Sequence, residues 1–281
     1  MSYATILVQL DAHPGLDDRI DQAARLARRF ESHLVGLAAA DHGLFGLGVE
    51  TGFAGTPRLA QAVEESRAAA QARARQLQDR LGTTSTPVSF EAVIDDDDEV
   101  TALVRRSTCC DLLVVGQPDP AWLGFARCRD QVERIVLQSV APTLVLPCMG
   151  HNTLATENVM IAWDGSHGAA RAVVGALPLL RQARRVHLVR CETGVEIEQG
   201  VDASSFDLPR EWLGRHGVRI EAMLERSGGD VVTALLTRAG SLGADLIVMG
   251  AWGMPRWAER LVGGTTRSML VSTNVPVLTS H

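Results

Sequence analysis

Two short stretches decide the fold: Asp111-Leu112-Leu113-Val114-Val115-Gly116 and Asp245-Leu246-Ile247-Val248-Met249-Gly250. Each consists of an aspartate, four apolar residues and a glycine. An uninterrupted apolar run of this length predicts a strand that is buried on both faces, as in a parallel sheet covered by helices. The recurrence of the same pattern predicts that the chain contains one structural unit twice.

Further stretches recur in the same order on either side of these two runs. Residues 6–11 match 159–164, residues 34–38 match 186–190, and residues 141–146 match 274–278. A helical pattern follows the first strand in both copies. Its apolar positions are Ile20, Ala23, Ala24 and Ala27 in the first copy, and Ala170, Val173, Val174 and Leu177 in the second. We therefore predict a tandem duplication with domains at residues 1–149 and 155–281, joined by a polar linker near residues 147–158.

Strand and helix patterns alternate through both copies, which predicts an α/β fold. We expect two tandem, doubly wound, five-stranded parallel-sheet domains of Rossmann-like type. The predicted helices cover residues 18–30, 57–81, 98–108 and 130–139, then 169–182, 208–215, 230–239 and 265–271. Strands near residues 88–94 and 218–224 complete the two sheets.

Composition excludes several classes of protein. The chain has 281 residues, 46% hydrophobic and 21% charged, with a formal net charge of -6. The acidic balance argues against a general nucleic-acid binder, whose affinity comes from basic clusters on phosphates. No apolar run reaches the roughly 20 residues of a membrane span, and no signal peptide is indicated. Five cysteines without a C-x-x-C pattern suggest neither disulfides nor zinc, so we expect a cytoplasmic protein.

Three local features allow more than one interpretation. Cys109-Cys110 is read as a pair of small buried residues at a helix end, with a redox sensor as the alternative. The acidic run at residues 95–99 precedes a helix, so we expect it to cap that helix rather than bind a metal. The glycine-rich stretch at residues 41–56 lacks the Gly-Lys-Ser/Thr of a phosphate loop, and we expect a surface loop.

A candidate ligand site lies in the second copy. Ligands of open parallel sheets bind at the carboxyl ends of the strands, where the winding reverses. Glycines there let the backbone approach a phosphate, and helix-start N–H groups and threonine hydroxyls can donate to its oxygens. The candidate residues are Asp164 after the first strand, Met249, Gly250 and Gly253 around the end of the fourth, and Gly263, Gly264, Thr265 and Thr266 before the last helix.

Structural roles compete with this interpretation. Asp164 could cap the helix that follows it, and the glycines could simply form turns. Trp163, Trp252 and Trp257 could line an adenine pocket, but packing against the sheet is the alternative we favour. We expect surface or packing roles for His167 and His187, which show no ligand spacing.

At these residues the chain resembles the universal stress protein family. That family carries a Gly-x2-Gly-x9-Gly-Ser/Thr signature after its fourth strand and an aspartate after its first. Gly250, Gly253 and Gly263 match the spacing, whereas Gly264 departs from the serine or threonine of the nucleotide-binding members. The resemblance covers both copies and implies an adenine nucleotide alpha hydrolase-like fold. It also implies a cytoplasmic stress-response protein that binds ATP, with Mg²⁺ as an optional companion, and that pairs its domains through their last strands.

The first copy has lost the signature. Gly116 is followed by Gln117-Pro118-Asp119, so a carboxylate stands where the second glycine would be, and proline removes an N–H donor. Asp11 remains at the end of the first strand. We therefore expect ligand binding in the second copy alone. The resemblance implies an internal pairing of the two copies, with a homodimer as a further assembly, and the apolar edge strands at residues 143–146 and 275–278 fit partners that cover them.

Three functions remain open from the sequence. The first is a stress protein that binds an adenine nucleotide. The second is a nucleotide-independent sensor or interaction module with unknown protein clients, which is motivated by Gly264 and the degenerate first copy. The third is a slow ATP hydrolase in which Asp164 holds Mg²⁺ or a water molecule. We rank hydrolysis last because the chain offers no P-loop lysine and no base beside an activated nucleophile, and we assign no catalytic or metal-binding residue.

Overall fold

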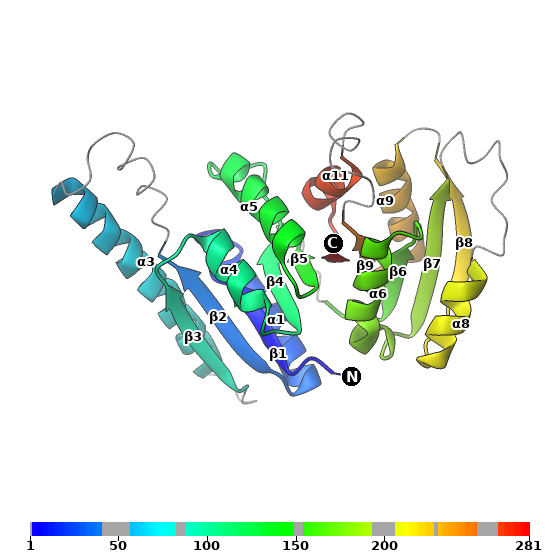
Figure 1. Ribbon diagram of the computed structural model, residues 1–281, viewed down its shortest axis with the longest axis horizontal. Coiled ribbons are helices and arrows are strands. Elements are labelled where there is room, and N and C mark those ends of the chain that lie inside the picture. The colour runs from blue at the N-terminus through cyan, green and yellow to red at the C-terminus, as the bar shows by residue number, and fades with distance from the viewer. Residues whose placement is uncertain are drawn as a thin grey trace. The chain divides into compact units, whose positions relative to one another are not determined.

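The computed structural model describes residues 2–40, 57–82, 88–148, 154–192, 206–227, 230–251 and 264–281. The chain divides into two compact units. An N-terminal unit contains Ser2–Gly116 and Ala126–Ala141, and a C-terminal unit contains Gln117–Phe125 and Pro142–His281. Both have the α/β architecture expected from the duplicated sequence, with parallel strands and helices on either face (Figure 1).

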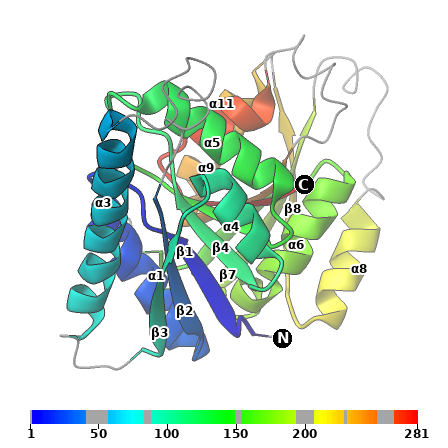
Figure 2. The same ribbon diagram turned by 60° about the vertical axis from the view of Figure 1, so that its left-hand side comes forward.

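In the N-terminal unit the strand order is β3-β2-β1-β4, and the neighbouring strands β2–β3, β1–β2 and β1–β4 are parallel. Figures 1 and 2 show α1 and α3 on one face of these strands and α4 and α5 on the other. The elements are β1 (Thr5–Gln9), α1 (Leu16–Phe30), β2 (His33–Ala39), α3 (Pro57–Gly82), β3 (Phe90–Asp95), α4 (Glu99–Ser107), β4 (Leu112–Gly116) and α5 (Phe125–Gln138).

In the C-terminal unit the order is β5-β10-β9-β6-β7-β8. All pairs are parallel except β5 with β10, the last strands of the two repeats, which pair antiparallel with Val145 opposite Val277. Helices α6 and α8 cover one face, and α9 and α11 the other (Figure 1). The elements are β5 (Thr143–Leu146), β6 (Asn158–Ala162), α6 (His167–Leu180), β7 (Arg185–Glu192), α8 (Asp207–Arg215), β8 (Glu221–Arg226), α9 (Val231–Leu242), β9 (Leu246–Gly250), α11 (Thr265–Ser272) and β10 (Val277–Ser280).

The aspartates that open the two deciding stretches hold the first strand of each repeat in place. Asp111 Oδ2 accepts hydrogen bonds from the backbone N–H groups of Ala4 (2.8 Å) and Thr5 (2.9 Å). Asp245 does the same for Glu157 (2.8 Å) and Asn158 (3.1 Å). The carboxylate therefore satisfies donors that the strand start leaves unpaired, which explains why the apolar run begins with aspartate in both repeats.

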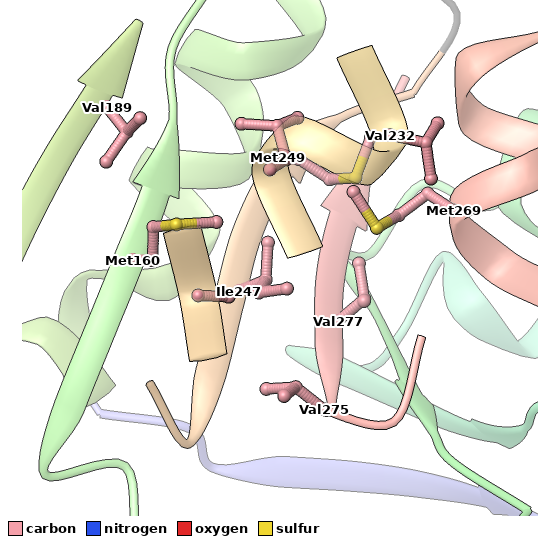
Figure 3. Packing of buried hydrophobic residues seen from close by; sticks show 10 residues of the cluster. Met160, Val189, Val232, Ile247, Met249, Met269, Val275 and Val277 are labelled. Carbon is pink, nitrogen blue, oxygen red and sulfur yellow. The ribbon is translucent and has the colours of Figure 1, made fainter. Parts of the chain in front are cut away.

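One hydrophobic core of the C-terminal unit lies between the sheet and the helices α9 and α11. Side chains of β6, β7, β9 and β10 meet Val232 of α9 and Met269 of α11 there (Figure 3). Met160, Ile247 and Met269 are fully buried. On the other face α6 buries Ala172, Val173 and Ala176, so helices cover both faces of the apolar strands, as their unbroken hydrophobicity predicts.

The acidic run before α4 acts as expected for a helix start. Asp98 is the N-cap residue, and its side chain accepts a hydrogen bond from the Thr101 N–H. Arg105 bridges the Asp95 and Asp97 carboxylates. The predicted capping role is confirmed. No group of three or more potential metal ligands occurs among the residues that the structure describes.

Two predictions need correction. The predicted inner face of α6 included Ala170 and Val174, but Ala170 is exposed and Val174 is half exposed. The buried face runs instead through Ala169, Ala172, Val173, Ala176 and Leu177, because a helix apolar on several sides offers more than one consistent stripe.

The pair Cys109-Cys110 is not wholly buried either, since Cys109 is exposed and Cys110 is half-buried. Burial and the neighbouring Asp111 carboxylate raise the pKa of Cys110 to about 12, which opposes a reactive thiolate.

Candidate functional site

The sheet edge where β6 and β9 end carries the predicted site residues of the second repeat. The two strands are parallel neighbours, with Ala162 opposite Met249. The chain leaves β9 at Gly250 and enters α11 at Thr265. Because α11 connects β9 to the parallel strand β10, its N-terminus lies at the same edge as the carboxyl ends of the strands. Asp164, Gly250 and the start of α11 therefore share the edge at which ligands bind in such sheets.

Asp164 shapes the turn between β6 and α6. Its Oδ1 accepts a hydrogen bond from the Ser166 N–H at 2.9 Å, while Gly165 takes a left-handed φ of 77°. Ser166, rather than Asp164, caps α6, since its hydroxyl oxygen accepts from the Ala169 N–H at 3.1 Å. Asp164 is exposed, so its carboxylate can accept further hydrogen bonds from a ligand.

Gly250 permits an unusually close approach of helix and strand. A Cβ atom at this position would lie 2.4 Å from the Ala169 nitrogen and 2.8 Å from the Gly168 carbonyl carbon. The first turn of α6 thus begins directly against the end of β9. The absence of a side chain at Gly250 makes room for this helix. Gly250 therefore has a packing role, in addition to the role predicted from the sequence of letting the backbone approach a phosphate.

The start of α11 explains the glycine at position 264. Gly264 has φ 58° and ψ 76°, in the left-handed region that glycine adopts without the strain of a side chain. Thr265 is exposed at the first helical position, whereas Thr266 is buried. The exposed hydroxyl and the positive end of the α11 dipole both favour an anion at this edge.

The other predicted site residues are placed differently. Met249 is 6% exposed and its side chain lies in the core with Met269 and Val232 (Figure 3). Gly253 and Gly263 lie outside the described residues, as do Trp252, Trp257 and the loop at residues 41–56. Of the predicted set, the structure brings Asp164, Gly250, Gly264 and Thr265 to the carboxyl edge of the sheet.

The corresponding edge of the first repeat is filled by an arginine. Asp11 makes the same side-chain contact as Asp164, with its Oδ1 accepting from the N–H two residues on, that of His13, at 3.0 Å. Arg19 of α1, 4% exposed, pairs with Asp11 at 3.0 Å and donates from Nη1 to the Gln9 carbonyl at 3.1 Å. A Cβ on Gly116 would lie 2.0 Å from Arg19 Nη2. The guanidinium therefore takes the space over the end of β4.

A second arginine and a glutamate complete this buried cluster. Arg73 of α3 donates to the carbonyls of Leu10 and Ala39, at 2.9 Å each, and so ties the ends of β1 and β2 together. Glu99 at the start of α4 is 9% exposed. Burial, and then the nearby Asp11 carboxylate, raise the pKa of Glu99 to about 7, while Gln9, Arg19 and Arg73 oppose the rise.

Arg19 was not singled out from the sequence, and Glu99 was considered only as the last residue of the acidic run at residues 95–99. The signal that could have identified Arg19 is its place in the apolar stripe of α1 with Leu16, Ile20 and Ala23. Arg19 lies eight residues after Asp11, which follows β1. The residue eight positions after Asp164 in the second repeat is Ala172, which is fully buried. The two repeats thus differ by an internal cation at this position.

Comparison with known proteins identifies the relatives of this chain. The model of the universal stress protein family matches residues 2–147 and again residues 155–281. The chain belongs to the universal stress protein family. A universal stress protein from Archaeoglobus fulgidus has the same fold, with a TM-score of 0.71 at 16% identity over 98% of this chain and 94% of that one. No curated protein sequence matches.

Two further solved structures align with this universal stress protein. A functionally unknown protein from Pseudomonas aeruginosa PAO1 has a TM-score of 0.58 at 16% identity, covering 98% of this chain and 92% of that one. A universal stress protein in complex with cAMP has a TM-score of 0.37 at 19% identity, covering 53% of this chain and 100% of that one.

Within the described residues of the present protein, none of the helices combines the length and the apolar character that a membrane span requires.

Proposed function

We propose that this universal stress protein binds one adenine nucleotide, ATP, at the carboxyl edge of β6 and β9 in the second repeat. The observation that carries the proposal is the spacing of Gly250, Gly253 and Gly263 between β9 and α11. This spacing connects the strand end to the helix start at the edge where parallel sheets bind ligands.

Two exposed side chains at this edge, those of Thr265 and Asp164, have roles in the proposed complex. The start of α11, with the exposed Thr265 hydroxyl, binds a phosphate group. The exposed Asp164 carboxylate accepts a hydrogen bond from a ribose hydroxyl or holds a water on Mg²⁺. Phosphates carry the negative charge that a helix N-terminus favours. The backbone N–H groups donate hydrogen bonds to them, so the site does not need a patch of basic side chains. The proposed output is a stress response in the cytoplasm through protein clients, with the homodimer as its assembly.

The first repeat does not take part in this proposal. Arg19 and its partners fill the edge over Gly116, and Gln117-Pro118-Asp119 replaces the glycine signature. The proposal therefore predicts one nucleotide per chain rather than two. The alternative of a nucleotide-independent interaction module remains a second candidate, because Gly264 departs from the pattern of the nucleotide-binding members.

Isothermal titration with ATP tests the proposal, with cAMP as a second ligand and GTP as a control for the base. Saturable heat with ATP that disappears in a Gly253→Asp variant supports it, because the new carboxylate repels phosphate. Gly240→Asp is the matched control, since Gly240 is exposed on α9 with no atom within 4 Å of an added Cβ. Absence of heat at millimolar ATP, or heat unchanged by Gly253→Asp, supports the interaction module instead.

A further inference from the structure

A cavity in the C-terminal unit lies between α6 and α8 and over β7. Its volume is about 380 Å³, within the range of roughly 300–1,000 Å³ found for small-molecule sites. Figure 1 shows α6 and α8 on the same face of the sheet. The lining residues are Trp163 after β6; Ala170, Val173 and Val174 of α6; Leu188 of β7; and Leu208, Pro209, Trp212 and Leu213 of α8.

The cavity marks a place where the two repeats differ. In the first repeat the helix that precedes β3, α3, spans 26 residues and buries Ala70, Ala74, Leu77 and Leu81 against the unit. In the second repeat the corresponding helix, α8, spans nine residues and buries Leu213. Apolar side chains consequently remain open to solvent at the cavity, with Leu208 78% and Val174 50% exposed. Exposed apolar surface around a hollow is typical of a ligand site.

The lining is uniformly uncharged. All nine residues have apolar side chains, two of them tryptophans. An ion would lose its hydration on entry without gaining a partner, so the cavity excludes phosphates and carboxylates. A neutral molecule with aromatic or alicyclic rings gains from burial against the indoles and the aliphatic side chains.

The wall formed by α8 is fixed before any ligand arrives. The rings of Trp212 and His216 meet edge to face, with centroids 4.6 Å apart. Arg181, just after α6, donates from Nε to the His216 carbonyl at 3.1 Å and contacts His216 Nδ1 with Nη2 at 3.1 Å. On the opposite wall the backbone N–H of Trp163 donates to the Val189 carbonyl at 2.8 Å. A preorganised wall lowers the entropy cost of binding.

From these observations we infer that the cavity between α6 and α8 is a binding site for a small, uncharged, ring-containing apolar molecule. This cavity and the proposed nucleotide site differ in chemistry, because the cavity binds a neutral ring compound and the nucleotide site binds an anion. It does not depend on nucleotide binding by the chain.

Titration of the full chain with N-phenyl-1-naphthylamine, an uncharged fluorescent amine, tests the inference. We expect saturable enhancement of fluorescence with one probe per chain. Ala170→Trp, at an exposed position that lines the cavity, fills it and should abolish binding. Glu211→Trp is the matched control: it adds the same indole at an exposed position of α8 outside the cavity and should leave the affinity unchanged.

A second variant guards against misfolding. Leu208→Asp changes a side chain that is already exposed, so folding should persist while the new charge weakens probe binding at least about tenfold. Circular dichroism melting checks that each variant is folded. Probe binding that is unsaturable, or equal in wild type, Ala170→Trp and Leu208→Asp, overturns the inference. Sedimentation showing a dimer that Ala170→Trp dissociates also overturns it, because a second copy would then be the occupant.

Discussion

Arg19 lies directly over Gly116, so that a Cβ on the glycine would stand 2.0 Å from the arginine Nη2. The same arginine pairs with Asp11, the counterpart of Asp164 in the second repeat. One repeat therefore closes its ligand edge with an internal cation, and the other keeps a small alanine at the equivalent helix position. This difference gives the duplicated fold two unequal halves.

Removing the internal cation should destabilise the N-terminal unit. Arg19→Ala leaves the Asp11 carboxylate without its partner in a buried setting, and loss of one member of a buried pair costs about 3–5 kcal/mol. Urea unfolding followed by circular dichroism measures the change. Arg25→Ala, at an exposed position of the same helix, should shift the free energy of unfolding by less than about 0.5 kcal/mol. Equal effects of the two variants would contradict the role given to Arg19.

Glu99 should make stability depend on pH near neutrality. Burial raises its pKa from 4.5 to about 7, so the folded protein retains a proton that the unfolded chain releases. The stability contributed by the protonated carboxyl is present below about pH 4.5 and is lost as pH rises through about 7. Glu99→Gln, which mimics the protonated form, should flatten the profile between these values. Urea unfolding from pH 5 to 8 checks this, and an unchanged slope in the variant would assign the titration to another group.

Gly250→Ala tests the packing of α6 against β9. The added Cβ would lie 2.4 Å from a backbone nitrogen that cannot move alone, so we expect a loss of about 1–3 kcal/mol. Gly240→Ala provides the opposite control, because it adds a methyl group in open space within a helix and should stabilise by about 0.5–1 kcal/mol. Thermal and urea unfolding compare them. A neutral Gly250→Ala would mean that the helix start is not held against the strand.

Gly264→Ser tests why this chain departs from the family signature. The left-handed φ of 58° disfavours any side chain, so the serine should cost about 1 kcal/mol although the nearest atom to its Cβ, in Arg267, is 3.4 Å away. We expect unchanged or weaker ATP affinity by calorimetry. Tighter ATP binding by the serine variant would show that Gly264 lowers the affinity for ATP, and would contradict the view that the left-handed backbone at this position requires glycine.

The strands and their order along the chain could be predicted because the signal is strong and local. The run from Leu246 to Gly250 is apolar at each of its first four positions, and only a strand covered on both faces uses such a run. The inner stripe of α6 was harder to predict, because Ala170 and Val174 are as apolar as the residues that are buried. Periodicity cannot choose between two apolar stripes on one helix.

The candidate site could be predicted only in part. Aspartate and glycine positions follow from strand ends, so Asp164 and Gly250 were found where expected. Arg19 was missed because an arginine in a helix is usually at the surface, and its burial depends on Asp11 and Gln9 from another element. Likewise, the side-chain direction of Met249 follows from the pleat of β9 and the position of α11, which the linear pattern does not contain.

Native mass spectrometry of the full chain at saturating ATP tests the central claim most directly. The account predicts one nucleotide per chain, lost in Gly253→Asp and retained in Arg25→Ala. Two nucleotides per chain would show that Arg19 does not close the first repeat, and none would show that the glycine spacing after β9 does not bind ATP.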